Sequence, residues 1–123
     1  MVIIDGITYD VPFVSCKRTA DFLDKYAKRT EDGGLKRKLI GVFINYQLKL
    51  GRVSNPEEYE ILWNKLTEPV EYHMVTVPGT VGNYQYQAYF SNVSDELMKQ
   101  HDDKNYWKSL TVNFTAKSPA RVP

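Results

Sequence analysis

The chain offers few side chains that could attack a substrate covalently. Cys16 is its single cysteine, and His73 and His101 are its two histidines. A thiol nucleophile needs a base beside it, and neither histidine stands at a motif spacing or a short metal-ligand spacing from Cys16. The flanking run FVSCK is typical of a buried or half-buried thiol that only packs. We therefore expect no cysteine hydrolase and no internal disulfide.

Acidic side chains in the first third of the chain are candidates for acid–base chemistry. They are Asp21, Asp24, Glu31 and Asp32. Two carboxyl groups can act as acid and base when their surroundings separate their pKa values. Because each of these has Lys or Arg neighbours in the sequence, we interpret them as solvated ion pairs. The sequence predicts no catalytic residue, no metal ligand and no cofactor.

The most charged stretch is YAKRTEDGGLKRKLIG, residues 26–41, which surrounds an Asp-Gly-Gly turn signal. Its charged side chains are Lys28, Arg29, Glu31, Asp32, Lys36, Arg37 and Lys38. A phosphate-binding glycine loop must lead into a helix, whereas this one leads into a strand pattern. Residues 17–38 hold eight Lys and Arg and four Asp and Glu, a net charge of +4 against −3 for the remainder. A solvated hairpin tip, an arm that docks on a second protein copy and a nucleic-acid contact all stay open.

Aromatic side chains could form a platform for sugars or bases, because ring faces stack and phenol groups form hydrogen bonds. The candidates are Tyr84, Tyr86, Tyr89 and Trp107. Tyr84 and Tyr86 fall on the same alternating face as Phe90, which is typical of a core. Tyr89 and Trp107 remain as an alternative face for a glycan or a host-surface ligand.

Periodicity places these residues in a chain made mostly of strands. Strands are expected at residues 2–4, 7–9, from 14 onward, 35–50, 70–78, 84–90 and 106–116. Asp5-Gly6 predicts a hairpin turn between the first two. Residues 22–26 could instead form a short helical turn, and the polar connection 91–105 has room for one near 95–100.

One helix is predicted at about residues 55–67, from the run SNPEEYEILWNKLTEP. Asn55 suits the N-cap, and Pro56 suits the first helical position. Apolar side chains occur at i, i+3, i+4 and i+7, which gives one stripe for packing on a sheet. The stripe consists of Tyr59, Leu62, Trp63 and Leu66.

The length of 123 residues suits a single domain, 1–123, with residues 117–123 as a flexible or partner-docked tail. Strands joined mostly by turns predict an α+β fold with mostly antiparallel strands. We expect a β-sandwich or open barrel with one flanking helix and an extended charged hairpin or loop at about 26–38. A net charge of +1 disfavours sequence-specific nucleic-acid binding, and no apolar run is long enough to suggest a membrane span.

Three stretches carry a resemblance to a known group of proteins. They are VSCKRTADFLDKYAKRTEDGGLKRKLIGVFINYQLKLG, PEEYEILWNKLTEPVEYHMVTVPG and YWKSLTVNFTAKSPARVP. In the order of their predicted elements and in their overall residue pattern, they resemble small structural tail proteins of long-tailed, siphovirus-like bacteriophages and prophages of Gram-positive bacteria. The chain is similar in this respect to tail-tube proteins and to the N-terminal ring domain of distal-tail proteins.

The resemblance implies a non-enzymatic subunit of a homo-oligomeric ring, with a hexamer as the family pattern, that contacts other tail proteins. It implies that the charged 26–38 hairpin is the assembly arm, carrying Lys28, Arg29, Glu31, Asp32, Lys36, Arg37 and Lys38. The expected location is the virion tail, after assembly in the cytoplasm of the bacterial host. Full distal-tail proteins carry further C-terminal domains whereas this chain ends at Pro123, so a tube, connector or minor tail role is expected.

Overall fold

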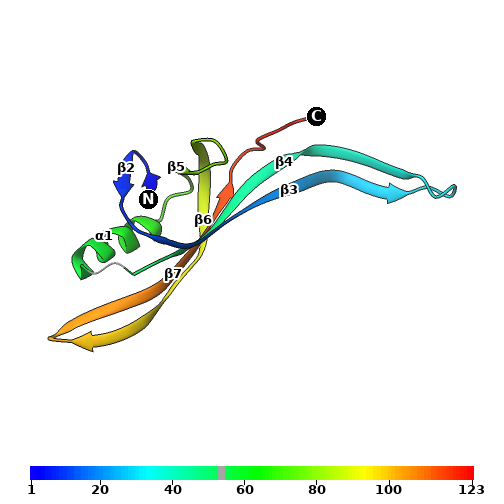
Figure 1. The fold of residues 1–123 in the computed structure, drawn as a ribbon. Helices are drawn as coiled ribbons and strands as arrows, with labels where there is room; N and C mark the ends of the chain where they lie inside the picture. The colour runs from blue at the N-terminus through cyan, green and yellow to red at the C-terminus, as the bar shows by residue number, and fades with distance from the viewer. Residues whose placement is uncertain (53–54) are drawn as a thin grey trace.

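A computed structural model describes residues 1–52 and 55–123. In these residues the chain forms an open sheet of seven strands and one helix (Figure 1). The elements are β1 (Val2–Ile4), β2 (Ile7–Tyr9), β3 (Phe13–Arg29), β4 (Leu35–Leu50), α1 (Pro56–Leu66), β5 (His73–Pro78), β6 (Asn83–His101) and β7 (Lys104–Ala116). The strand order is β2-β1-β5-β6-β7-β4-β3, and every pairing is antiparallel. This confirms the expected α+β class, and the sheet does not close into a barrel.

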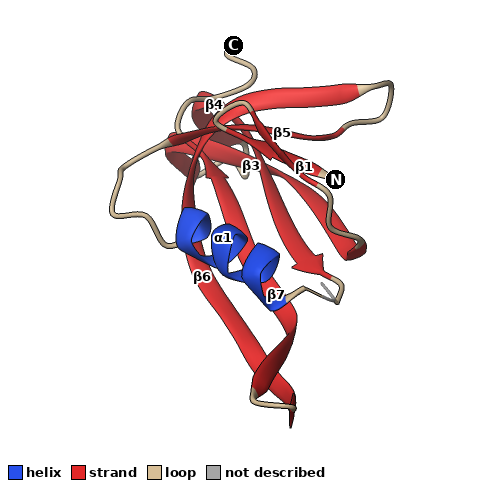
Figure 2. Cartoon of the chain, turned by 90° about the vertical axis from the view of Figure 1, so that its left-hand side faces the viewer, coloured by secondary structure: helices blue, strands red, loops and turns tan. Residues whose placement is uncertain are grey.

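The helix forms as its sequence predicts. The Asn55 side chain accepts a hydrogen bond of 3.0 Å from the Glu57 N–H and so satisfies one free donor of the first turn. Tyr59, Leu62 and Leu66 are buried, and the whole helix lies over one face of β6 and β7 (Figure 2).

The core lies where α1 covers the centre of the sheet. Phe114 is fully buried on β7, and its ring stacks on that of Phe90 with centroids 4.5 Å apart. The remaining buried apolar side chains include Val2, Ile4, Tyr46, Leu48, Leu50, Leu62, Val75, Val77, Leu110 and Val112. The sheet curls around them and brings β4 close to β5, although β7 and β6 lie between these strands in the sheet order. The Tyr46 hydroxyl on β4 donates a 3.0 Å hydrogen bond to the Pro78 carbonyl on β5.

Two long hairpins extend from this core in opposite directions (Figure 1). The β3–β4 hairpin stays paired as far as Arg29 and Leu35, and the β6–β7 hairpin as far as His101 and Lys104. The helical turns considered at residues 22–26 and 95–100 are therefore wrong. Cross-strand hydrogen bonds from β4 and β7 stabilise extended backbone there despite the weak local pattern.

Two further expectations differ from the structure. Cys16 is exposed rather than buried, because β3 is the last strand of the sheet and its side chains lie at the rim of the core. The strand expected from residue 70 begins at His73.

The C-terminal segment packs on its own chain. The Val42 N–H donates to the Arg121 carbonyl at 2.9 Å, and the Ala120 N–H donates to the Val42 carbonyl at 2.8 Å. Gly41 allows this approach, since a Cβ atom there would lie 2.6 Å from Pro119 Cβ. Residues 119–121 thus occupy the edge of β4 just beyond β7, where the sequence predicted only a flexible or partner-docked tail.

This contact gives a first prediction. Gly41→Ala should lower the free energy of unfolding by about 1–2 kcal/mol, because the new methyl group clashes with Pro119 and the Arg121 backbone. Urea unfolding measures the change. The same substitution in a chain truncated after Lys117 is the control, and there it should cost little. An equal loss in both backgrounds would show that the tail does not occupy this place.

Candidate functional site

The outer part of the β3–β4 hairpin, residues 22–42, stands clear of the core, and we call it the arm. Its strands pair from Phe22 and Val42 outward to Arg29 and Leu35. The turn at its end, residues 30–34, is held by hydrogen bonds from the Thr30 N–H to the Gly34 carbonyl at 2.7 Å and from the Gly33 N–H to the Thr30 carbonyl at 2.9 Å. The arm is therefore an ordered two-stranded ribbon.

Polar contacts define the turn further. Hydrogen bonds from the Thr30 hydroxyl and the Gly34 N–H lower the pKa of Asp32 below its usual range. Gly33 has φ +84°, a left-handed conformation that a residue with a Cβ adopts only under strain. The Asp-Gly-Gly signal thus specifies the turn itself, and its backbone groups are mostly used within it.

All seven charged residues predicted for the arm lie there, and all are exposed. Arg37 is engaged within the arm, because its Nε lies 2.5 Å from Asp24 Oδ1 and its guanidinium lies over the Phe22 ring. Lys28 and Lys36 lie directly opposite each other in the strand register. Like charges at directly opposed positions destabilise a pair of strands.

The arm also exposes apolar side chains on a ribbon that has water on both faces. These are Phe22, Leu23, Tyr26, Leu35 and Ile40, each between 44% and 58% exposed. Within the described residues, the outer edge of β3 has no strand partner, and β4 has none on its second edge from Gly41 to the tip, beyond the bridge of Val42 with Arg121. Unpaired backbone groups and exposed apolar side chains together favour contact with another chain.

At the opposite end of the molecule, α1 and the outer β6–β7 hairpin enclose a groove of about 550 Å³, which we call the α1–β7 groove. Its aromatic side chains are Tyr59, Trp63, Tyr106 and Trp107, and its acidic side chains are Glu57, Glu60, Asp95 and Asp103. Among the described residues that line the groove, Lys104 is the one basic residue. The Tyr59 hydroxyl donates a 2.7 Å hydrogen bond to Asp95, and burial together with this carboxylate raises the pKa of Tyr59.

The structure does not bring Tyr89 and Trp107 together as one ligand face. Ala88 and Phe90 point to the core, so Tyr89 between them points to the opposite side of the sheet. Trp107 lies opposite Leu97 in the register and lines the groove beside α1, on the core side. Of the two, only Trp107 belongs to the groove, and its aromatic neighbours come from the helix.

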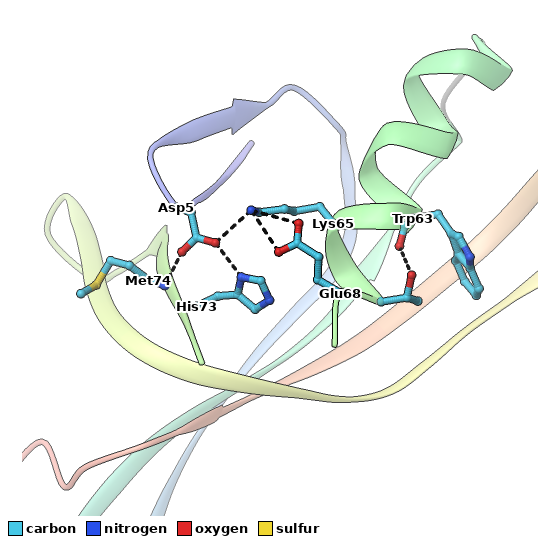
Figure 3. Close-up of polar contacts among 7 residues, drawn as sticks. Asp5, Trp63, Lys65, Glu68, His73 and Met74 are labelled. Carbon is cyan, nitrogen blue, oxygen red and sulfur yellow. Dashed lines mark hydrogen bonds and ion pairs between the residues drawn. The ribbon is translucent and has the colours of Figure 1, made fainter. Parts of the chain in front are cut away.

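A charged cluster that sequence reasoning missed joins the β1–β2 turn to the end of α1 and the start of β5 (Figure 3). Asp5 Oδ2 lies 2.6 Å from His73 Nδ1 and 3.0 Å from Lys65 Nζ, and Glu68 lies 3.4 Å from the same ammonium. His73 is buried and stacks on Phe90 with centroids 4.4 Å apart. No spacing signal connects residues 5 and 73, because only the pairing of β1 with β5 brings them together.

Asp5, Glu68 and His73 have the donor types that hold a divalent cation, and their donor atoms lie within 4.8 Å of one another. However, the Lys65 ammonium already lies beside both carboxylates and neutralises much of their charge. We therefore interpret the cluster as a structural tie between the N-terminal hairpin and the helix.

Comparisons of the chain with models of protein families, with curated proteins and with solved structures found no match. In residues 1–52 and 55–123, no helix has the length and apolar character needed to cross a membrane.

The cluster predicts an acid-sensitive contribution to stability. Desolvation alone would raise the pKa of Asp5, but hydrogen bonds from His73, the Met74 N–H and Lys65 lower it from 3.8 to about 2. A lowered carboxyl pKa stabilises the fold above pH 4, and this stabilisation is lost as the pH falls from about 4 to about 2. Asp5→Asn should cost roughly 1 kcal/mol at pH 7, since the Asp5 side chain is 35% exposed and solvent screens its contacts.

Urea unfolding of both proteins at pH 7, 4 and 2.5 checks this. The difference between wild type and Asp5→Asn should be largest at pH 7 and should shrink at pH 2.5. Asp10→Asn, an exposed neighbour in the same segment, serves as the control. A difference that stays constant with pH would contradict the assignment.

Proposed function

We propose that this chain is a non-enzymatic structural subunit of a bacteriophage or prophage tail, which assembles into a ring or tube-like part through contacts between subunits. The observation that carries the proposal is the arm. It is an ordered ribbon that extends beyond the core and holds an opposed lysine pair, Lys28 and Lys36. Such a pair is unfavourable in isolation, and a partner carrying acidic groups relieves it.

Apolar exposure on the arm supports the same function. Phe22 and Leu35 are each 58% exposed, far from the helix that covers the core. A two-stranded ribbon is at best marginally stable in water, and burial of these side chains against another subunit would stabilise it.

The free edge of β3 offers a second mode of contact. An edge strand can accept a strand from a neighbouring subunit through main-chain hydrogen bonds, which do not require a large apolar patch. Subunits could then join side by side through β3 while the arm reaches further along the assembly.

The tail setting comes from the resemblance of the three sequence stretches to siphovirus-like tail proteins. It supplies the proposed ring, the other tail proteins as partners and the virion tail as the location. Passage of DNA through the ring would involve no sequence-specific contact.

The alternative is a monomeric module that binds a glycan or a host-surface ligand. It would use the exposed aromatic side chains, but Tyr89 and Trp107 lie on opposite faces of the sheet. We therefore place assembly first.

Charge reversal on the arm tests the proposal. A variant with Arg29, Lys36, Arg37 and Lys38 changed to Glu should associate at least about tenfold more weakly, because the arm loses its attraction for an acidic partner. Light scattering over a concentration series measures association. The thermal transition should change little, since exposed charges contribute little to fold stability.

A matched control changes four exposed basic residues outside the arm and outside β3 to Glu, namely Lys49, Arg52, Lys108 and Lys117. It alters the net charge equally and should associate more like the wild type. A wild-type chain that stays monomeric at high concentration, alone and with its tail partners, would reject the assembly function. Unchanged association of the arm variant would reject the arm as the interface.

A further inference from the structure

We propose that the α1–β7 groove of one copy binds the arm tip of a second copy, so that subunits join head to tail. The inference rests on the proposed assembly function and names the acceptor that the arm requires. It derives from the charges, the side chains and the positions of two surfaces at opposite ends of one chain.

The two surfaces carry opposite charge. Residues 17–38 have a net charge of +4, and the rest of the chain has −3. Much of this negative charge lines the groove, where four carboxylates stand against the single ammonium of Lys104. Lys28 and Lys36 at the arm tip would meet Glu57 and Glu60 on the exposed side of α1, and this would relieve the repulsion between the two lysines.

The side chains also match in kind. Trp63 and Trp107 line the groove, and lysine or arginine cations bind favourably over the faces of tryptophan rings. The arm tip adds Tyr26 and Leu35, which are exposed and would be buried against these rings. A volume of about 550 Å³ lies within the usual range for binding pockets, about 300–1,000 Å³, and suits the side chains of a hairpin tip rather than a whole domain.

The contact must form between copies. The arm and the β6–β7 hairpin extend from the core in opposite directions (Figure 1), so the arm does not reach the groove of its own chain. An interface between two different surfaces is heterologous and repeats from copy to copy, which yields a closed ring or an open filament. A closed ring and an open filament are both consistent with the proposed ring or tube-like part of a phage tail.

Matched charge reversals test the proposal on the full chain. The arm variant is Lys28→Glu with Lys36→Glu, which preserves the like-charge repulsion inside the arm. The groove variant is Glu57→Lys with Glu60→Lys. Its control is Glu58→Lys with Glu71→Lys, a pair of exposed residues that do not line the groove.

Sedimentation velocity should show association at least about tenfold weaker for the arm variant and for the groove variant, and near wild type for the control. A chain that carries both reversals should associate again, because its acidic arm meets a basic groove. A mixture of the two single variants should also associate, with the two variants alternating, because each arm is opposite in charge to the groove of the other variant. Thermal melting of each variant confirms that it is folded.

The possible failures are distinct. A monomeric wild type rejects the assembly function and with it this contact. If the wild type and the groove variant assemble but the arm variant does not, only the assignment of the groove as the acceptor is rejected. Binding of a chitotetraose probe that is lost with Trp107→Ala, while association is unchanged, would assign the groove to a glycan and overturn the proposal.

Discussion

The apolar core supports only the middle of the two long hairpins, and this constraint governs the rest of the structure. The buried side chains of β7, Leu110, Val112 and Phe114, lie under α1 and alternate with half-buried neighbours. Toward the tips, both hairpins leave this cover, and their residues become exposed. Pairs between adjacent strands then provide the contacts that hold each tip together.

The arm is a ribbon without a core of its own. Its strands pair as far as the Asp-Gly-Gly turn, Arg37 contacts Asp24 on its surface, and Lys28 and Lys36 oppose each other. Such a segment contributes little to the stability of an isolated subunit. Its apolar and basic side chains lie outside the core, where they are exposed and can contact a partner.

Ion pairs and core packing hold α1 in place at the end of the molecule opposite the arm. The Asp5 cluster ties the N-terminal hairpin to Lys65 at the end of α1 and to His73 at the start of β5. The helix is therefore held at its C-terminal end by ion pairs and along its length by the core. This holds Tyr59 and Trp63 in place beside Trp107, so the groove is a feature of packed elements rather than of loops.

The sequence by itself determined the elements whose signals are local. The Asn55 cap and the apolar stripe set α1, Asp5-Gly6 set the first turn, and the alternation after Leu35 set β4. Only the tertiary structure decided the extended course of residues 91–101, the opposite faces of Tyr89 and Trp107, and the meeting of Asp5 with His73. The physical reason is that caps, turns and periodicity act over a few residues of the chain. Cross-strand hydrogen bonds and packing join residues far apart in the chain, and they can impose an extended backbone where the local pattern is weak.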